Sequence, residues 1–151
     1  MKNSSDLATP EDKIADETRP IDEAEFVYRR IPRIYFDASL PIPIQREAFR
    51  PTDKDTTGLS VFRAAFAQPL DTLANVDPAK VKDYYVARLS VRDLRNLGLH
   101  VEPDPIASGP LGHAVIPELS WPAYQANKQN LKPILVQLAR LASGDIVHVA
   151  S

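Results

Sequence analysis

Histidine is the side chain best suited to proton transfer near neutral pH, and the chain carries three, His100, His113 and His148. They lie too far apart in sequence for the short histidine spacings of a zinc site, and no cysteine is present to complete one. The lack of cysteine also removes disulfides and thiolate nucleophiles. The sequence therefore predicts no metal centre, no thiol chemistry and no bound cofactor.

His113 has the most informative position of the three, because it opens a predicted strand directly after the turn at residues 109–112. Two interpretations stand open: a catalytic base, or a ring that bonds loop backbone, as most buried polar groups do. A Ser-His-Asp triad is also open, since all three residue types occur. The G-x-S-x-G nucleophile turn is missing, however, and the nearest segment, Gly58-Leu59-Ser60, lacks the second glycine.

Glycine-rich phosphate loops are missing from the sequence, in both the G-x-x-x-x-G-K-[ST] and the G-x-G-x-x-G form. The turn Gly109-Pro110-Leu111-Gly112 does not replace them, because proline has no backbone N–H to offer a phosphate. Nucleotide binding through such loops is therefore not expected.

Arginine is the prominent basic residue of the chain after residue 25. Its planar guanidinium grips carboxylates and phosphates with two hydrogen bonds, so arginines are candidate ligand-binding residues. The three candidates that we single out are Arg29, Arg30 and Arg63. Nearby aromatic side chains could stack on nucleic-acid bases, but these arginines could equally pair with neighbouring acids.

Charge is segregated along the chain. Residues 1–25 have a net charge of −5, whereas the remaining residues, with 15 basic and 12 acidic side chains, have a net charge of +3. The first part is poor in apolar side chains, so we predict a disordered acidic tail over 1–25 and a folded body over 26–151. A net charge of +3 is low for a nucleic-acid binder, so nucleic acid is an unfavoured partner. Whether the tail covers the arginine-rich face or stays in solvent is left open.

Length and composition indicate one globular domain. The chain has 151 residues, of which 44% are apolar and 25% charged, as in ordinary soluble domains. No apolar run resembles a secretory signal or reaches the roughly 20 residues of a membrane helix. We therefore expect a cytoplasmic protein that does not contact a membrane.

Alternating apolar residues predict a sheet, and capping signals predict short helices between its strands. Ser90 and Gly98 bracket one such helix as N-cap and stop, and Asp77 with Pro78 begins another. The segment 37–57 is expected as a long proline-containing connection of the kind that often carries function. The predicted strands cover 26–31, 58–64, 84–89, 99–102 and 113–116, and a further short helix begins at Pro69. Residues 145–149 either close the sheet as an edge strand or trail off.

The longest predicted helix spans about 122–142. Its apolar stripe includes Leu131, Leu135, Leu138 and Leu141, which we expect in the core. Pro133 either starts this helix or kinks it, so 122–130 is open as a separate helical segment. Trp121 is expected to anchor the start of the helix rather than to bind a ligand.

Short blocks between Tyr28 and Ile116 resemble a group of small uncharacterised bacterial domains. The resemblance rests on the order of Arg29-Arg30-Ile31, Leu59-Ser60-Val61, Leu97-Gly98-Leu99 with Asp104-Pro105, and His113-Ala114-Val115-Ile116. It implies a compact bacterial α+β domain and carries no activity with it.

A second resemblance concerns chemistry. An arginine on the first strand, a serine on a later strand and a glutamate near the end is similar to the order found in ADP-ribosyltransferases. Here these residues are Arg29 or Arg30, Ser60 and Glu118. The resemblance implies that the arginine and serine hold NAD while the glutamate orients the ribose. The sequence departs from that family, because Ser60 lacks the Ser-Thr-Ser context and Glu118 follows Pro117.

Together these observations predict an α+β domain in which a small mixed sheet of four to six strands packs against a C-terminal helix, with short additional helices. The leading functional hypothesis is a non-enzymatic interaction or regulatory module with a protein partner. The alternatives are an ADP-ribosyltransferase-like enzyme that uses NAD, and a weak nucleic-acid binder with an arginine-rich face. Convergence of Arg29, Ser60, His113 and Glu118 in one cleft would favour the enzyme.

Overall fold

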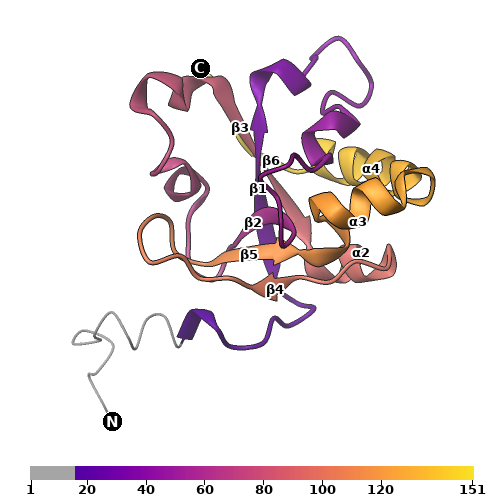
Figure 1. Cartoon of the computed structure of the whole chain (residues 1–151). Coiled ribbons are helices and arrows are strands. Elements are labelled where there is room, and N and C mark those ends of the chain that lie inside the picture. Colours follow the sequence, from indigo (N-terminus) through magenta and orange to yellow (C-terminus); the bar gives the residue numbers. More distant parts are fainter. Residues whose placement is uncertain (1–15) are drawn as a thin grey trace.

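Alternating apolar side chains build a single six-stranded sheet, shown in Figure 1. The computed structural model describes residues 16–151. The sheet has the order β4-β5-β2-β1-β3-β6, and every pairing in it is antiparallel. Its strands are β1 (Phe26–Pro32), β2 (Leu59–Arg63), β3 (Tyr84–Ser90), β4 (Glu102–Pro103), β5 (His113–Ile116) and β6 (Ile146–His148).

The helices are short, apart from the last one. Ser90 caps α2 by accepting a hydrogen bond from the Asp93 N–H, and Asp77 caps η5 through the Ala79 N–H, so both predicted caps are confirmed. The α-helices are α2 (Val91–Asn96), α3 (Trp121–Ala126) and α4 (Lys128–Ser143). The 3-10 helices are η2 (Arg33–Tyr35), η3 (Arg46–Phe49), η4 (Pro69–Leu73), η5 (Pro78–Asp83) and η6 (Pro117–Leu119).

Both faces of the sheet are covered, by different elements. One face, which we call the α4 face, packs Val27, Ile31 and Val61 against α4 and η3. The opposite face, which we call the η4 face, buries a smaller cluster of Tyr28, Phe62, Val86 and Leu73. Because successive strand residues point to opposite faces, this division fixes the face on which each polar strand residue lies.

The central strands β1 and β2 diverge after a short common stretch. All seven residues of β1 pair with β3, but only Val27 and Tyr28 pair with β2, opposite Arg63 and Phe62. In Figure 1, β1 and β3 accordingly stand at a wide angle to β2 and β5. The divergence leaves the Ser60 carbonyl without a ladder partner from β1, and the side chain of Arg29 takes that place.

The α+β class, the C-terminal helix and the short additional helices are confirmed, but the sheet is antiparallel rather than mixed. The six-residue α2 is too short for a parallel crossover, and the chain continues from β3 to β4 at the opposite edge of the sheet. The strand predicted over 99–102 shortens to Glu102–Pro103, because the Leu99 N–H bonds the Leu94 carbonyl and so closes the end of α2.

The predicted last helix is divided at Asn127 into α3 and α4, so a separate first segment is present, but it ends at Ala126 and not at residue 130. Pro133 lies inside α4 and does not end it. Leu131, Leu135 and Leu138 are buried in the core as predicted, whereas Leu141 is only partly buried. No helix in the part of the chain from residue 16 onward is long and apolar enough to cross a membrane.

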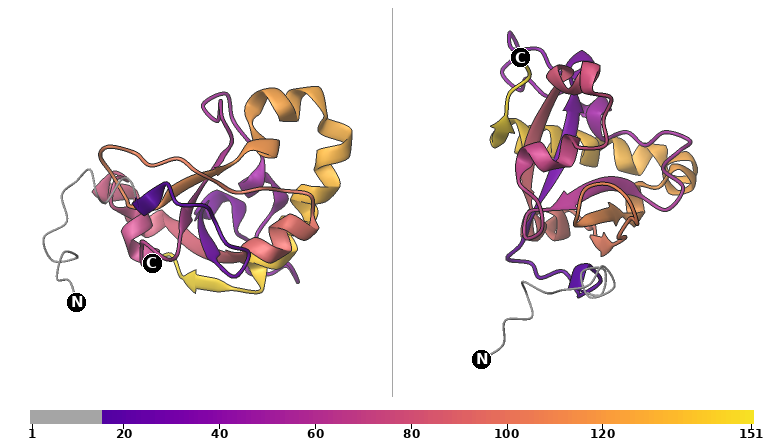
Figure 2. Two further views of the ribbon diagram at one scale, coloured as in Figure 1. Left: turned by 90° about the horizontal axis from the view of Figure 1, so that it is seen from below. Right: turned by 90° about the vertical axis from the view of Figure 1, so that its left-hand side faces the viewer.

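Residues 16–25, predicted as part of a disordered tail, instead pack along the end of the sheet beside β4 and β5 (Figure 2). Ile21 joins the core, and the buried Glu17 carboxylate accepts a hydrogen bond of 2.7 Å from the Gly112 N–H. The sequence analysis did not predict this packing, because the residues that contact 16–25 are distant from them in sequence. The rest of the predicted tail, residues 1–15, lies outside the described residues.

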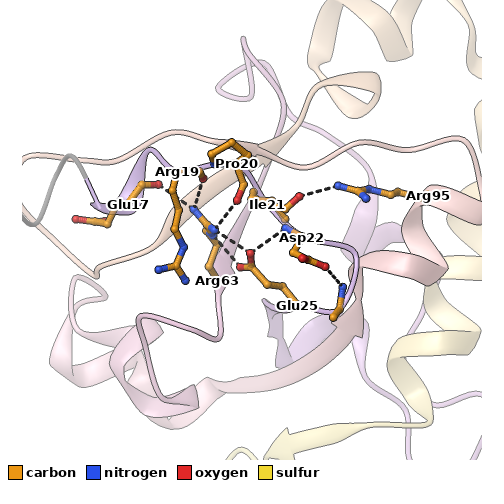
Figure 3. Close-up of polar contacts among 9 residues, drawn as sticks. Glu17, Arg19, Pro20, Ile21, Asp22, Glu25, Arg63 and Arg95 are labelled. Carbon is orange, nitrogen blue, oxygen red and sulfur yellow. Dashed lines mark hydrogen bonds and ion pairs between the residues drawn. The ribbon is translucent and has the colours of Figure 1, made fainter.

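Arg63 is the main anchor of this segment, as Figure 3 shows. It is fully buried, and its guanidinium donates two hydrogen bonds to the Glu25 carboxylate, at 3.0 and 2.9 Å. The same guanidinium also donates to the backbone carbonyls of Glu17, Arg19 and Pro20. Residues 16–25 thus supply the negative charge and the carbonyl acceptors that the buried Arg63 guanidinium needs. The strand β2 alone does not provide them.

Glu25 makes the fold sensitive to acid. Burial alone would raise the pKa of its carboxyl, but the hydrogen bonds from Arg63 and from the Asp22 N–H and the positive charge of Arg63 outweigh it and lower that pKa. A carboxyl whose pKa is lower in the folded state stabilises the fold at neutral pH, and that stabilisation is lost as pH falls below the unfolded value of about 4.5.

We therefore expect the urea midpoint of the native protein to fall between pH 6 and pH 3.5, and to fall less in the Glu25→Gln variant. Urea titrations followed by circular dichroism at both pH values measure this. Glu102, an exposed carboxyl of β4, gives the matched control Glu102→Gln, which should keep the native pH dependence. Identical pH dependence in the native and Glu25→Gln proteins would contradict the assignment.

Candidate functional site

Arg29 is half-buried on the α4 face, where its guanidinium links two elements. It donates two hydrogen bonds to the Ala48 carbonyl of η3, at 3.2 and 2.8 Å, and one of 2.9 Å to the Ser60 carbonyl of β2. Burial lowers its pKa to about 10, and no carboxylate bonds it among the described residues. All of these acceptors are backbone atoms. The hydrogen bonds of Arg29 therefore fasten the connection 37–57 to the sheet where β1 and β2 diverge.

Arg30 points to the other face. Its Nη1 atom donates to the Thr72 carbonyl and to the Asn75 side chain, and its guanidinium lies 5.1 Å above the centre of the Phe62 ring. Desolvation lowers the pKa of this half-buried group. Within residues 16–151, Nε and Nη2 of Arg30 make no hydrogen bond, so these donors are available to a ligand.

Ser60 and His113 meet on the η4 face, although they come from different strands. The Ser60 Oγ and His113 Nε2 atoms are 3.0 Å apart, and His113 Nδ1 lies 2.8 Å from the Asp104 carbonyl oxygen and 3.4 Å from its carboxylate. The His113 ring also meets the edge of Phe62, with 5.4 Å between ring centres. The His113 ring therefore bonds loop backbone, as one interpretation expected, and it also bonds a serine hydroxyl, as a catalytic base would.

Glu118 does not join this group. Its carboxylate accepts a hydrogen bond of 2.8 Å from the His100 N–H and lies 2.6 Å from His100 Nδ1. Arg29 also stays apart, because it lies on the opposite face from the Ser60 side chain. The four residues proposed as one enzyme site are therefore not brought together: the side chains of Ser60 and His113 touch, whereas Arg29 reaches only the Ser60 backbone carbonyl.

Arg63, the third candidate ligand-binding arginine, offers no surface to a ligand in this structure. Its side chain is fully buried beneath residues 16–25, where it bonds Glu25. Arg63 was predicted as a ligand-binding residue alongside Arg29 and Arg30, because no neighbour in sequence distinguishes a buried arginine from an exposed one at the end of a strand.

A cavity suited to a ligand lies elsewhere, between the end of η3 and the start of α3 and α4. It is an open groove of about 540 Å³, within the usual range for ligand sites. A smaller pocket of about 130 Å³ adjoins it and shares Arg50, Tyr124 and Lys132. The groove is lined by Arg50, Pro51, Thr52, Asp53, Trp121, Tyr124, Gln125, Lys128 and Lys132.

Local hydrogen bonds shape this groove. The Asp55 carboxylate accepts a bond of 2.7 Å from the Thr52 N–H, which closes the turn at one wall. The Asp55 carbonyl accepts a bond of 2.8 Å from the Trp121 N–H, which ties this turn to the first residue of α3. The predicted anchor role of Trp121 is thus visible, but the same residue also lines the groove.

The groove is cationic. Lys128 and Lys132 lie one helical turn apart on α4 with exposed side chains, and the exposed Arg50 is the third cation. None of these three cations makes an ion pair within the described part of the chain. Asp53 is the only acidic residue of the lining. The groove therefore presents unneutralised positive charge beside two aromatic rings.

The sequence contained a signal for this groove that our reading of it did not use. The spacing of Lys128 and Lys132 places both on one helix face, and Trp121 precedes them. The long connection 37–57 was expected to carry function, and Arg50, Thr52 and Asp53 of the lining come from it. Their convergence depends on tertiary packing of η3 against α4.

Comparison with protein-family models, with curated proteins and with solved structures finds no match to this chain. The resemblances to small bacterial domains and to ADP-ribosyltransferases therefore stay predictions. In the described part of the chain, no group of three or more His, Asp or Glu side chains is arranged to hold a metal ion.

Proposed function

We propose that this chain is an interaction module, and that the cationic groove binds an acidic segment of a protein partner. The observation that carries the proposal is a set of three exposed cations, Arg50, Lys128 and Lys132, which make no ion pair within residues 16–151 and lie beside Trp121 and Tyr124 in one groove. Arginine and aromatic side chains are enriched where proteins bind partners, and opposite charge steers association.

A peptide suits this groove better than a long polyanion. The groove is small, and its cations gather between the end of η3 and the start of α4 instead of forming a stripe along the surface. Asp53 in its lining, together with Glu47 in the adjoining pocket, would repel a continuous phosphate backbone. Carboxylates spaced along a peptide can bind the cations while its apolar side chains contact the aromatic rings.

Trp121 permits a direct binding test, because it is the only tryptophan of the chain. We expect a ten-residue peptide of alternating Glu and Leu to change the Trp121 fluorescence in a saturable manner, with affinity falling as salt is raised. An unchanged emission spectrum at millimolar peptide would overturn the proposal. Tighter binding of a single-stranded oligonucleotide than of the peptide would favour the nucleic-acid hypothesis instead.

Charge reversal of the groove is expected to weaken peptide binding at least about tenfold. In the Lys128→Glu/Lys132→Glu variant, two attractive contacts become repulsive, which costs roughly 1.4 kcal/mol or more in binding. Fluorescence titration of Trp121 measures the change. Lys80→Glu/Lys82→Glu is the matched control, because both lysines are exposed on η5 and outside the groove. Equal loss of affinity in the two variants would show that binding depends on net charge alone.

A further inference from the structure

The hydrogen-bonded chain from Ser60 through His113 to Asp104 has the connectivity of a nucleophile, its base and an acceptor that orients the base. From this geometry we propose that Ser60 is a nucleophile with His113 as its general base, and that the pair hydrolyses small esters with an anionic acyl group. This activity goes beyond the proposed binding function and uses the η4 face, not the cationic groove.

The orientation of the His113 ring supports this role. Its Nδ1 atom lies 2.8 Å from a backbone carbonyl oxygen, which can only accept, so Nδ1 carries the proton. In the neutral ring Nε2 is then the acceptor, and the Ser60 hydroxyl donates to it across 3.0 Å. This tautomer is the one that a general base needs in order to take the serine proton.

The surroundings keep the base in place. The His113 side chain is only 11% exposed, the Phe62 ring meets it edge-on, and the Asp104 carboxylate lies 3.4 Å from Nδ1. That carboxylate and the Asp104 carbonyl would stabilise the imidazolium formed when His113 accepts a proton. Asp104 is thus a positioning residue that acts through His113 and does not contact the substrate.

Arg30 gives the site its preference for an anionic acyl group. It lies on the same face as Ser60, above the Phe62 ring that also contacts His113, and its Nε and Nη2 donors are free among the described residues. A guanidinium in this half-buried position can bind a carboxylate with two hydrogen bonds. A dicarboxylic monoester, in which a carboxylate and an ester share a short chain, matches this pair of groups.

The reaction follows from these roles. Ser60 Oγ attacks the ester carbonyl carbon while His113 Nε2 takes the hydroxyl proton, and the ester C–O bond breaks with that proton passing to the leaving alcohol. Water then attacks the acyl-serine, His113 again takes and returns a proton, and the free acid leaves. No oxidation or reduction occurs, and water is the only co-reactant.

Two probes test the proposal on the full chain. A fluorophosphonate should label Ser60 at one site, located by peptide mass spectrometry. The mono-p-nitrophenyl ester of succinic acid should release nitrophenol catalytically. Ser60→Ala should abolish both signals, and His113→Gln should lower the rate of labelling about 10²–10⁴-fold, the usual contribution of a general base. Ser39→Ala is the control, because its hydroxyl bonds Asp37 and no histidine.

Arg30→Gln separates substrate binding from serine reactivity. We expect it to raise KM for the succinate ester about tenfold or more while leaving fluorophosphonate labelling within about threefold. Circular dichroism confirms that each variant folds. The proposal is overturned if native protein is not labelled at Ser60, if His113→Gln is labelled as fast as native protein, or if nitrophenol release survives in Ser60→Ala. Any of these outcomes leaves the groove proposal intact, because peptide binding reports on Trp121 instead.

Discussion

Replacing Arg63 by methionine is expected to lower the free energy of unfolding by about 3–5 kcal/mol, the usual cost of removing one partner from a buried ion pair. Methionine fills much of the space of the arginine side chain, so the loss measures the guanidinium and not a cavity. The substitution removes both hydrogen bonds to Glu25 and leaves the carbonyls of Glu17, Arg19 and Pro20 without their donor.

Urea denaturation at pH 7, followed by circular dichroism, measures this loss. Arg92→Met is the matched control, because Arg92 also pairs with a residue of the N-terminal segment, Glu23, but through an exposed contact of 3.5 Å. It should change the free energy of unfolding by less than about 1 kcal/mol. If Arg63→Met and Arg92→Met are equally stable, residues 16–25 are not held by the buried cluster.

Native-state hydrogen exchange adds a second measurement for the same substitution. In Arg63→Met, the Gly112 N–H that donates to Glu17 should exchange much faster, since that bond depends on the position of residues 16–25. Slow exchange at Gly112 in the variant would contradict the anchoring role even if global stability fell.

Gly58→Ala is expected to destabilise the protein by roughly 2–4 kcal/mol, because the site cannot accept a methyl group. A Cβ atom at Gly58 would lie 2.7 Å from the Ile116 carbonyl oxygen and 2.9 Å from Val115 Cβ, both in β5. The clash can be relieved only if the paired backbones of β2 and β5 move apart, because Leu59 and Ile116 lie opposite each other in the ladder. The strain therefore acts on the β2–β5 pairing that brings Ser60 and His113 together.

Gly98→Ala is the comparison variant for this prediction. Gly98 has φ of +81°, which an L-residue adopts at a cost of about 1–2 kcal/mol, but a Cβ there would meet nothing within 4 Å. Thermal and urea unfolding of the two variants therefore distinguish the stability lost to a steric clash from the stability lost to an unfavourable backbone φ. A Gly58→Ala protein as stable as Gly98→Ala would show that β5 yields easily at this point.

Local signals in the sequence were sufficient for much of the fold. Ser90 and Asp77 cap helices as predicted, and the alternation over β3 and β5 is reproduced, because caps and strand periodicity depend on neighbours in sequence. The segment 16–25 could not be recognised in this way. Its acidic residues are typical of a solvated tail, and only the folded structure shows that Arg63 lies beside them.

The candidate sites were harder to predict, for the same reason. Ser60 and His113 were both singled out, but the bond between them depends on the β2–β5 register, which pairs Phe62 with His113 and sets Ser60 diagonally to it. Glu118 was placed with them by analogy of order alone, and it bonds His100 instead. Order along a chain carries no information about which side chains share a face.

The non-sequential strand order has a kinetic consequence. The middle strand β1 must find β3, and β2 must find β5, across long intervening segments, and such non-local pairing gives refolding times of roughly milliseconds to seconds. On the ribosome, the apolar surface under α4 and the outer edge of β3 stay uncovered until α4 and β6 emerge from the exit tunnel. Nascent chains stalled before Lys128 should therefore bind chaperones, and chains extended beyond residue 151 by a tunnel-length linker should release them.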